Sequence, residues 1–523
     1  MKKSAFFSAP GFTVAAMIAV TLFSKILGLI RQMMMAGIFA ATPEGIAFSA
    51  ASGIPLAIFD MLFSTAVLGS FLPIYKGRLE TDTKRAQAFS SSFLTGIVLV
   101  TTAAALIGSI FAHPILLLAA PELDGETASL ALLLLRMMFP AVIFAGAAYT
   151  LVGILQSHEK FLLPAFVSAL SNLVMILYLT FCPKPISKVS VIGLAVAYLV
   201  SWAVQFLTLA IPLVRQKKFP KPIKNILTFD TKLAAKRSLP VMFGSWLIPM
   251  TSLIAKSCSS VVDGNTIEMG AYSGTAIVVY ENAFSIFTIA AGLLTYGICN
   301  YIFPKLSERI AKGDKNGFLH LTEIGTVASL ALILPICATV FFLADEIVEL
   351  LYLRGNFTQG LATATANALR ILSFAMPAYG MTEFFSRVCY SCGKVRFPMV
   401  ASLSGILLSL GLSAAFLVCG VISVETVSLA VVLGQVTACG ILVCLFCLFE
   451  KHVLHLKKII FFLPGLLLEC SILWLSRNFL RQILHFSQTF QNFLIITIVF
   501  IVGFMVYLIW LVLAGILPVR QND

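Results

Sequence analysis

Apolar stretches long enough to cross the hydrocarbon core of a bilayer recur along almost the whole chain. Windows of about 20 residues, separated by charged or Pro- and Gly-containing loops, predict about fourteen transmembrane helices. The predicted spans are residues 12–40, 45–75, 86–112, 127–157, 161–182, 189–214, 236–262, 269–303, 317–343, 360–389, 395–419, 424–449, 459–476 and 488–516. We therefore expect an all-α polytopic membrane protein.

Composition excludes a soluble globular protein. Hydrophobic residues make up 59% of the 523 residues and charged residues only 11%, whereas soluble domains are about 25% charged. The net charge of +13 does not indicate a nucleic-acid partner, because most basic residues lie in short loops between apolar spans. Lys and Arg are about five times as frequent on one predicted side as on the other, which places both termini in the cytoplasm.

The chain also repeats itself. Arg136 and Pro164 have the same separation in the sequence as Arg370 and Pro398, so the two pairs are related by a constant offset of 234. Lys25 and Lys256 form a second match at an offset of 231. The repeat predicts two parallel six-helix lobes around a central cavity, followed by two additional transmembrane helices. The predicted division is 1–226, 227–450 and 451–523.

Basic residues inside apolar spans are the main candidates for function. Each costs several kcal/mol to hold in hydrocarbon unless it faces water, a counter-charge or an anionic ligand. The six are Lys25, Arg31, Arg136, Lys256, Arg370 and Arg387. Arg387 lies near the cytoplasmic end of its span, where snorkelling accounts for it. The other five predict a polar cavity that accepts anions.

Carboxylates also occur inside the spans, including Asp60, Glu281, Glu383 and Glu469. They either balance the cations or form a proton or cation site, and the sequence leaves both interpretations open. No nucleotide-binding loop, metal-binding His pair or nucleophile with a nearby base is present. We therefore expect no enzyme activity, no cofactor and no metal site.

Four segments carry a family resemblance: SKILGLIRQMMMAGIFA, AFSAASGIPLAIFDMLFSTAVLGSFLPIY, LLYLRGNFT and CYSCGKVRFP. They are similar to the MurJ (MviN) family of lipid II flippases in the MOP exporter superfamily. The resemblance implies a V-shaped pair of lobes, a cationic cavity and a groove for the lipid tail formed by the last two helices. It also implies movement of the undecaprenyl-diphosphate-linked peptidoglycan precursor to the outer leaflet of the bacterial plasma membrane by alternating access. Lipid II or a related polyprenyl-diphosphate lipid, membrane lipids and cell-wall synthesis proteins are the implied partners.

The chain departs from the family pattern at several positions. Lys25 and Arg31 keep the two basic residues of the first span. In the second span, Ile46, Gly53 and Phe59 stand where the family has an acid, a basic residue and, in some members, an arginine. The resemblance and the buried charges together predict the following substrate-binding residues: Lys25, Arg31, Asp60, Arg136, Lys256, Glu281, Asn282 and Arg370.

In the eighth span, Tyr280, Glu281 and Asn282 occupy the region of a family arginine. Some members bind sodium through aspartates of the seventh and eleventh spans, and residues 236–262 and 395–419 contain no carboxylate. These departures characterise a divergent member with altered coupling.

Three other functions remain open from the sequence. The first is a flippase for another polyprenyl-diphosphate oligosaccharide, such as a capsule or O-antigen unit. The second is a cation-coupled drug exporter, although such exporters normally have twelve spans and an acidic cavity. The third is a non-transporting scaffold of cell-wall synthesis, which has no need for charges inside its spans.

Overall fold

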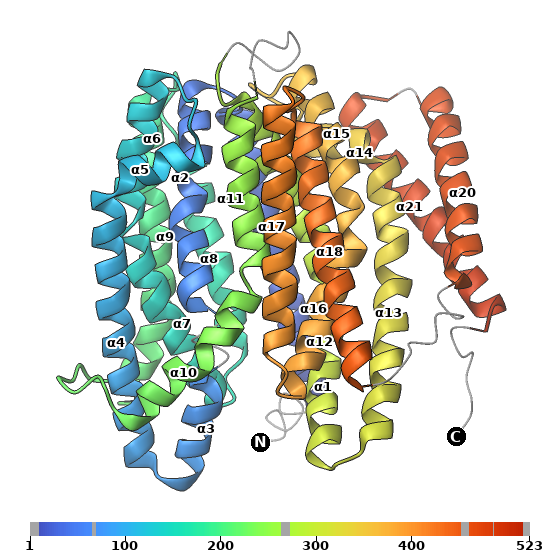
Figure 1. Cartoon of the computed structure of the whole chain (residues 1–523). Coiled ribbons are helices and arrows are strands. Elements are labelled where there is room, and N and C mark those ends of the chain that lie inside the picture. The colour runs from blue at the N-terminus through green and yellow to red at the C-terminus, as the bar shows by residue number, and fades with distance from the viewer. Residues whose placement is uncertain (1–9, 65–69, 263–271, 451–459, 485, 516–523) are drawn as a thin grey trace, which may run out of the picture. The chain divides into compact units, whose positions relative to one another are not determined.

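The computed structural model describes residues 10–64, 70–262, 272–450, 460–484 and 486–515 (Figure 1). Within these ranges every regular element is helical, which confirms the predicted all-α class. The chain divides into two units. Among the described residues, unit 1 covers the chain up to 262 together with 272–278, and unit 2 covers the chain from 279 onward.

Unit 1 contains eleven α-helices and one π-helical turn in the part of the chain that the structure describes. They are α1 (Pro10–Ile38), α2 (Pro43–Phe59), η1 (Asp60–Ser64), α3 (Leu72–Thr81), α4 (Thr83–Ile110), α5 (Ala112–Ala119), α6 (Gly125–Met138), α7 (Ala141–Ser157), α8 (Leu162–Thr180), α9 (Lys188–Arg215), α10 (Phe229–Gly244) and α11 (Leu247–Ser260).

Unit 2 is formed by α12, which begins in unit 1, and the helices that follow it. They are α12 (Thr275–Ala311), α13 (Lys315–Phe342), α14 (Ala344–Tyr352), α15 (Gln359–Ser373), α16 (Ala375–Ser391), α17 (Arg396–Val418), α18 (Val424–Glu450), α20 (Phe462–Ile483) and α21 (Gln488–Leu513). The last two lie side by side at the red end of the colour scale (Figure 1). The predicted boundary at residue 451 and both chain ends lie outside the described residues.

Among the described residues, eleven segments are long and apolar enough to span a membrane, or twelve if α10 and α11 form one bent span. The predicted count of fourteen is therefore not confirmed. Two features account for the difference. The predicted span 360–389 is divided at Phe374 into α15 and α16, which have 15 and 17 residues. The apolar run of α20 is interrupted by Glu469, Arg477 and Arg481.

The helix boundaries repeat between the two units. The first residues of α6, α7 and α8 match those of α15, α16 and α17 at the same offset of 234 that relates Arg136 to Arg370. Helices α4 and α13 have equal lengths of 28 residues. Asp82 caps the first by accepting hydrogen bonds from the Lys84 and Arg85 N–H groups at 3.0 and 3.1 Å, and Asp314 caps the second by accepting from Gly317 N–H at 2.8 Å. The sequence repeat therefore corresponds to a repeat of local structure.

The cap of α13 is also electrostatically favourable. The Gly317 N–H group and the Arg309 guanidinium together lower the pKa of Asp314 below its ordinary value. Asp314 therefore stays ionised near neutral pH, and its negative charge lies at the positive end of the helix dipole.

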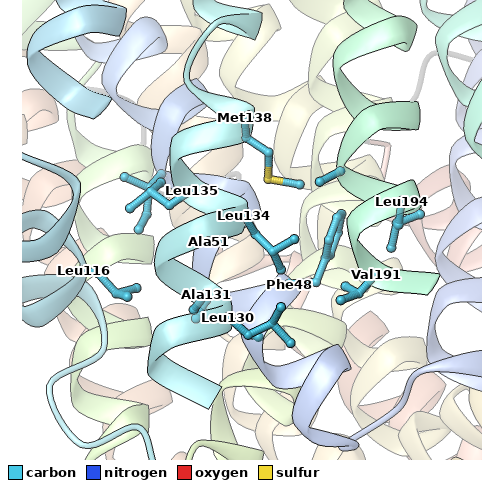
Figure 2. Close-up of a cluster of buried hydrophobic side chains, with 14 of the residues drawn as sticks. Phe48, Ala51, Leu116, Leu130, Ala131, Leu134, Leu135, Met138, Val191 and Leu194 are labelled. Atoms are coloured by element: carbon cyan, nitrogen blue, oxygen red, sulfur yellow. The ribbon is translucent and has the colours of Figure 1, made fainter. Parts of the chain in front are cut away.

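Each unit has its own apolar core. In unit 1, Phe48 and Ala51 of α2 pack against Leu130, Leu134 and Met138 of α6 and against Val191 and Leu194 of α9 (Figure 2). In unit 2, aromatic residues of α16 and α18 form a comparable cluster, in which the Phe385 and Phe446 rings lie 5.5 Å apart. These cores fix the helices that carry the charged side chains described below.

Candidate functional site

Helix α2 is the element around which the polar residues of unit 1 gather. Thr42 caps it by accepting a hydrogen bond from Gly45 N–H at 3.2 Å, and Pro43 is placed at its first turn, where its missing N–H costs nothing. Pro55 lies inside the helix and cannot donate a backbone hydrogen bond. The α-helix ends one turn later and continues as the π-helical turn η1, which begins with Asp60.

Lys256 extends from α11 to the face of α2 that carries Ser49 and Gly53. Its Nζ atom donates a hydrogen bond to the Ser49 carbonyl oxygen at 3.2 Å, and only 7% of the residue is exposed. A β-carbon on Gly53 would lie 2.9 Å from Nζ, so the glycine leaves the space that the ammonium group occupies. The structure therefore places Lys256 where α2 itself lacks a basic residue.

Arg31 of α1 and Asp60 of η1 are related through a tyrosine of unit 1. Both are within electrostatic range of Tyr198 of α9, and Asp60 is also within range of Tyr149 of α7. The Tyr198 hydroxyl donates a hydrogen bond to the Ser52 carbonyl oxygen at 3.4 Å. The two predicted residues thus share a polar group of unit 1 with two tyrosines.

Lys25 lies on the exposed side of α1. The adjacent side of the helix packs against α8, where Asn172 Nδ2 donates to the Ser24 carbonyl oxygen at 3.1 Å. Asn172 also lies 3.4 Å from the place of a β-carbon on Gly28, so Gly28 permits the close approach of α8. This packing leaves the Lys25 ammonium accessible.

Arg136 and Arg370 are equivalent in the repeat but have different surroundings. Arg370, in the last turn of α15, forms an ion pair with Asp345 of α14 and donates to Asn367 Oδ1 at 2.8 Å. At the positions in α5 that match Asp345 and Glu346 of α14, the chain has His113 and Pro114. Helix α5 therefore offers no carboxylate to Arg136, whose side chain is exposed.

The remaining predicted residues belong to unit 2. Asn282 of α12 is 3% exposed, and its carbonyl oxygen accepts a hydrogen bond from the Tyr352 hydroxyl at 3.4 Å. Glu281, the residue before it, is half-buried. The structure therefore places Arg31, Asp60 and Lys256 in unit 1, with Lys256 against α2 and Asp60 at its end, and it places Glu281, Asn282 and Arg370 in unit 2.

Sequence reasoning missed three contributors: the carbonyl group of Ser49, and the phenols of Tyr149 and Tyr198. A polar aromatic residue in the middle of an apolar span was the available signal for the two tyrosines, because a buried hydroxyl needs a partner. Nothing in the sequence indicated Ser49, whose carbonyl group contacts Lys256 only in the folded chain.

The basic side chains of this group in unit 1 are chemically suited to anion binding. Ammonium and guanidinium groups donate charge-assisted hydrogen bonds to phosphate oxygens. Within the described ranges, no group of three or more His, Cys, Asp or Glu residues is arranged to hold a metal ion.

Comparison with known proteins identifies the family. A family model described as lipid II flippase MurJ matches residues 35–504. The chain belongs to the MurJ family. A probable lipid II flippase MurJ from Bdellovibrio bacteriovorus is 28% identical to this MurJ-family chain over 407 residues, which are 77% of the chain and 74% of the relative. Lipid II flippase MurJ from Burkholderia cenocepacia is 25% identical over 384 residues, covering 72% and 73%.

Solved structures agree on the fold of the MurJ-family chain. An inward closed conformation of lipid II flippase MurJ superimposes with a TM-score of 0.77 at 20% identity, covering 94% of this chain and 97% of the other. An inward-facing multidrug resistance transporter of the MATE family, in the MOP superfamily, gives 0.65 at 14% identity, covering 84% and 98%. The membrane-transporter fold expected from the sequence is confirmed.

Proposed function

We propose that this MurJ-family chain moves lipid II from the cytoplasmic to the outer leaflet of the bacterial plasma membrane by alternating access. Family membership and the names of the relatives support lipid II as the substrate. The structural observation that carries the proposal is the buried ammonium of Lys256 beside Gly53, which adds a positive charge and a hydrogen-bond donor to the polar residues around α2.

The predicted cations of unit 1 bind the diphosphate in this proposal. Lys25 and Arg136 present exposed charges, Lys256 lies against α2, and Arg31 lies within electrostatic range of Tyr198. The negative charge of Asp60, within range of the same tyrosine, limits the attraction of the group for the anion, so that the substrate can also be released. The predicted substrate contacts in unit 2 remain Glu281, Asn282 and Arg370. Arg370 is the weakest of these candidates, because it forms an ion pair with Asp345.

Membrane potential supplies a driving force. With the inside negative, outward movement of an anion is favoured by about 2.3 kcal/mol per charge per 100 mV. We further propose that residues 1–226 and 227–450 act as parallel lobes, that 451–523 form the groove for the lipid tail, and that both termini are cytoplasmic. Cell-wall synthesis proteins remain a predicted class of partner.

Depletion of the native lipid II flippase in a bacterial host tests the function. The chain should restore growth and cell shape, and purified chain in proteoliposomes should move lipid II to the other leaflet. A matched assay with an undecaprenyl-diphosphate-linked capsule or O-antigen unit measures specificity. Movement of that unit without movement of lipid II would replace the proposed substrate, and movement of neither would remove the transport proposal.

A further inference from the structure

Glu469 of α20 is a carboxyl group that the proposed transport mechanism does not use. Its side chain is 0% exposed, and neither carboxylate oxygen has a hydrogen-bond partner among the described residues. It lies between two apolar clusters of unit 2 that join α13 to α20 and α21. One contains Ala338, Leu473 and Val499, and the other contains Phe462, Tyr507 and Leu511.

Among the described residues, the groups recorded around Glu469 on the packed helices carry no positive charge. On α21, a β-carbon on Gly503 would lie 3.5 Å from Glu469 Cγ, and Tyr507 is within electrostatic range. The Tyr507 hydroxyl is itself buried without a partner in the described part of the chain. Cys337 of α13 and Cys470 of α20 are the other titratable groups within range.

The described arginines of the same hairpin form ion pairs with carboxylates other than Glu469. Arg477 donates from Nε to Glu346 Oε1 at 2.7 Å and from Nη2 to Asp345 Oδ2 at 2.7 Å. Arg481 Nη2 also lies 2.7 Å from Glu346 Oε1. Arg477 is more than two helical turns beyond Glu469 on the same helix, which is a rise of about 12 Å. These guanidinium groups therefore do not neutralise Glu469.

A buried carboxylate with neither a counter-charge nor a hydrogen-bond donor is far less stable than the neutral acid. We propose that Glu469 is a proton-binding site in the α20–α21 hairpin, occupied while the hairpin is packed and emptied when unfolding exposes the carboxyl group to water. The site takes a proton and no other cation, because a metal ion needs several oxygen ligands.

The sign of the pH dependence follows from linkage. Above the ordinary pKa of a glutamate in water, the packed hairpin binds more protons than the unfolded one, so rising pH destabilises the packed state. The contribution of Glu469 to stability is complete only in acid, where both states hold the proton, and it is lost progressively as the pH rises until the packed state also ionises. This inference concerns helix packing in unit 2 and stands independently of the transported lipid.

Two measurements on the purified full chain test the site. The first is thermal unfolding in detergent between pH 4 and pH 9 for the wild type, Glu469→Gln and the exposed control Glu80→Gln. The amide imitates the neutral acid, so the wild type and Glu80→Gln should lose several degrees of melting temperature more than Glu469→Gln over this range. Equal losses in all three proteins would overturn the proposal.

The second measurement uses the hydrophobic reagent dicyclohexylcarbodiimide. The acid O–H adds across one C=N bond of the reagent: the proton goes to nitrogen, the carboxyl oxygen bonds to carbon, and rearrangement gives a stable N-acylurea without loss of atoms. Peptide mass spectrometry should find the adduct on Glu469 at pH 7, with at least tenfold less at pH 10. Labelling that is equal at both pH values, or absent at both, counts against a protonated carboxyl.

Discussion

Lys256 Nζ lies 2.9 Å from the point that a β-carbon on Gly53 would occupy, so the ammonium of α11 fills the space left by the glycine of α2. The family resemblance places a basic residue at position 53, and this chain supplies the charge from another helix. The structure thus has a positive charge beside α2 that comes from α11.

Replacement of Lys256 should therefore impair transport more than replacement of a surface lysine. Lys256→Met should lower translocation of lipid II about tenfold or more, because a hydrogen bond to a charged group is worth roughly 1.5–3 kcal/mol. Gly53→Ala should give a smaller loss, since the flexible Lys256 side chain can shift away from the added methyl group. Translocation in proteoliposomes is the measurement, with Lys224→Met in the exposed linker as the matched control. Activity of Lys256→Met equal to that of the control would exclude the residue from the site.

Replacement of Arg370 should lower the stability of the protein, whereas replacement of Arg136 should lower transport and leave stability nearly unchanged. Arg370→Ala removes the ion pair with Asp345 and should lower the free energy of unfolding by about 1–3 kcal/mol. Arg136→Ala should change that free energy by less than about 0.5 kcal/mol, as expected for an exposed side chain, while lowering translocation. Unfolding in detergent and translocation assays on both variants check this. Destabilisation by Arg136→Ala as large as that by Arg370→Ala would contradict the assignment.

Asp345 and Glu346 of α14 should stabilise the packing of the α20–α21 hairpin through their ion pairs with Arg477 and Arg481. Glu346 is fully buried, accepts a hydrogen bond from Arg477 and forms an ion pair with Arg481, so Glu346→Gln leaves two guanidinium groups with less counter-charge. We expect a loss of about 2 kcal/mol in stability, below the roughly 3–5 kcal/mol for a fully buried pair, because Arg481 is partly exposed. Glu308→Gln breaks an exposed pair with Lys312 and should have no measurable effect in the same unfolding experiment.

The turns after α7 and α16 are equivalent in the repeat, and each contains a residue with a positive φ angle. Glu159 has a φ of 59°, and Gly393, at the equivalent position of the repeat, has a φ of 73°. In each turn the next N–H group donates to a helix carbonyl oxygen: Lys160 to Leu155 at 2.9 Å and Lys394 to Cys389 at 2.8 Å.

Gly393→Ala should therefore cost about 1 kcal/mol of stability, because a β-carbon strains the left-handed conformation. Glu159→Gly should stabilise the protein by up to about 1 kcal/mol for the same reason. Thermal unfolding of the two variants measures both effects, and a loss of stability in Glu159→Gly would show that the Glu159 side chain makes contributions beyond its backbone.

Transport should not require sodium. Helices α11 and α17 contain no Asp or Glu, and Asp230 of the neighbouring α10 is ion-paired with Arg78 and Arg85 at 2.8 and 3.1 Å. A sodium ion buried in a span needs several oxygen ligands and generally a carboxylate. Translocation in proteoliposomes should be unchanged when potassium replaces sodium on both sides and should respond to an imposed potential. A strict sodium dependence would place the ion on carbonyl and hydroxyl ligands.

The apolar spans and their repeat were readable from the sequence because both depend on local composition and spacing. The offset between Arg136 and Arg370 reappears in the boundaries of α6, α7 and α8 and their counterparts. The break at Phe374 and the span count were not predictable, because hydropathy does not distinguish one long helix from two short ones joined at a bend.

The sequence alone determined the class of protein, the family and the presence of charges inside the spans, since each follows from residue type and order. Only the tertiary structure decided which charges have partners. It gave Arg370 a carboxylate and left Arg136 exposed, placed Lys256 over Gly53, and buried Glu469 without a donor among the described residues. The physical reason is that the free energy of a charge in an apolar span depends on the groups within a few ångströms, and these come from helices far apart in the chain.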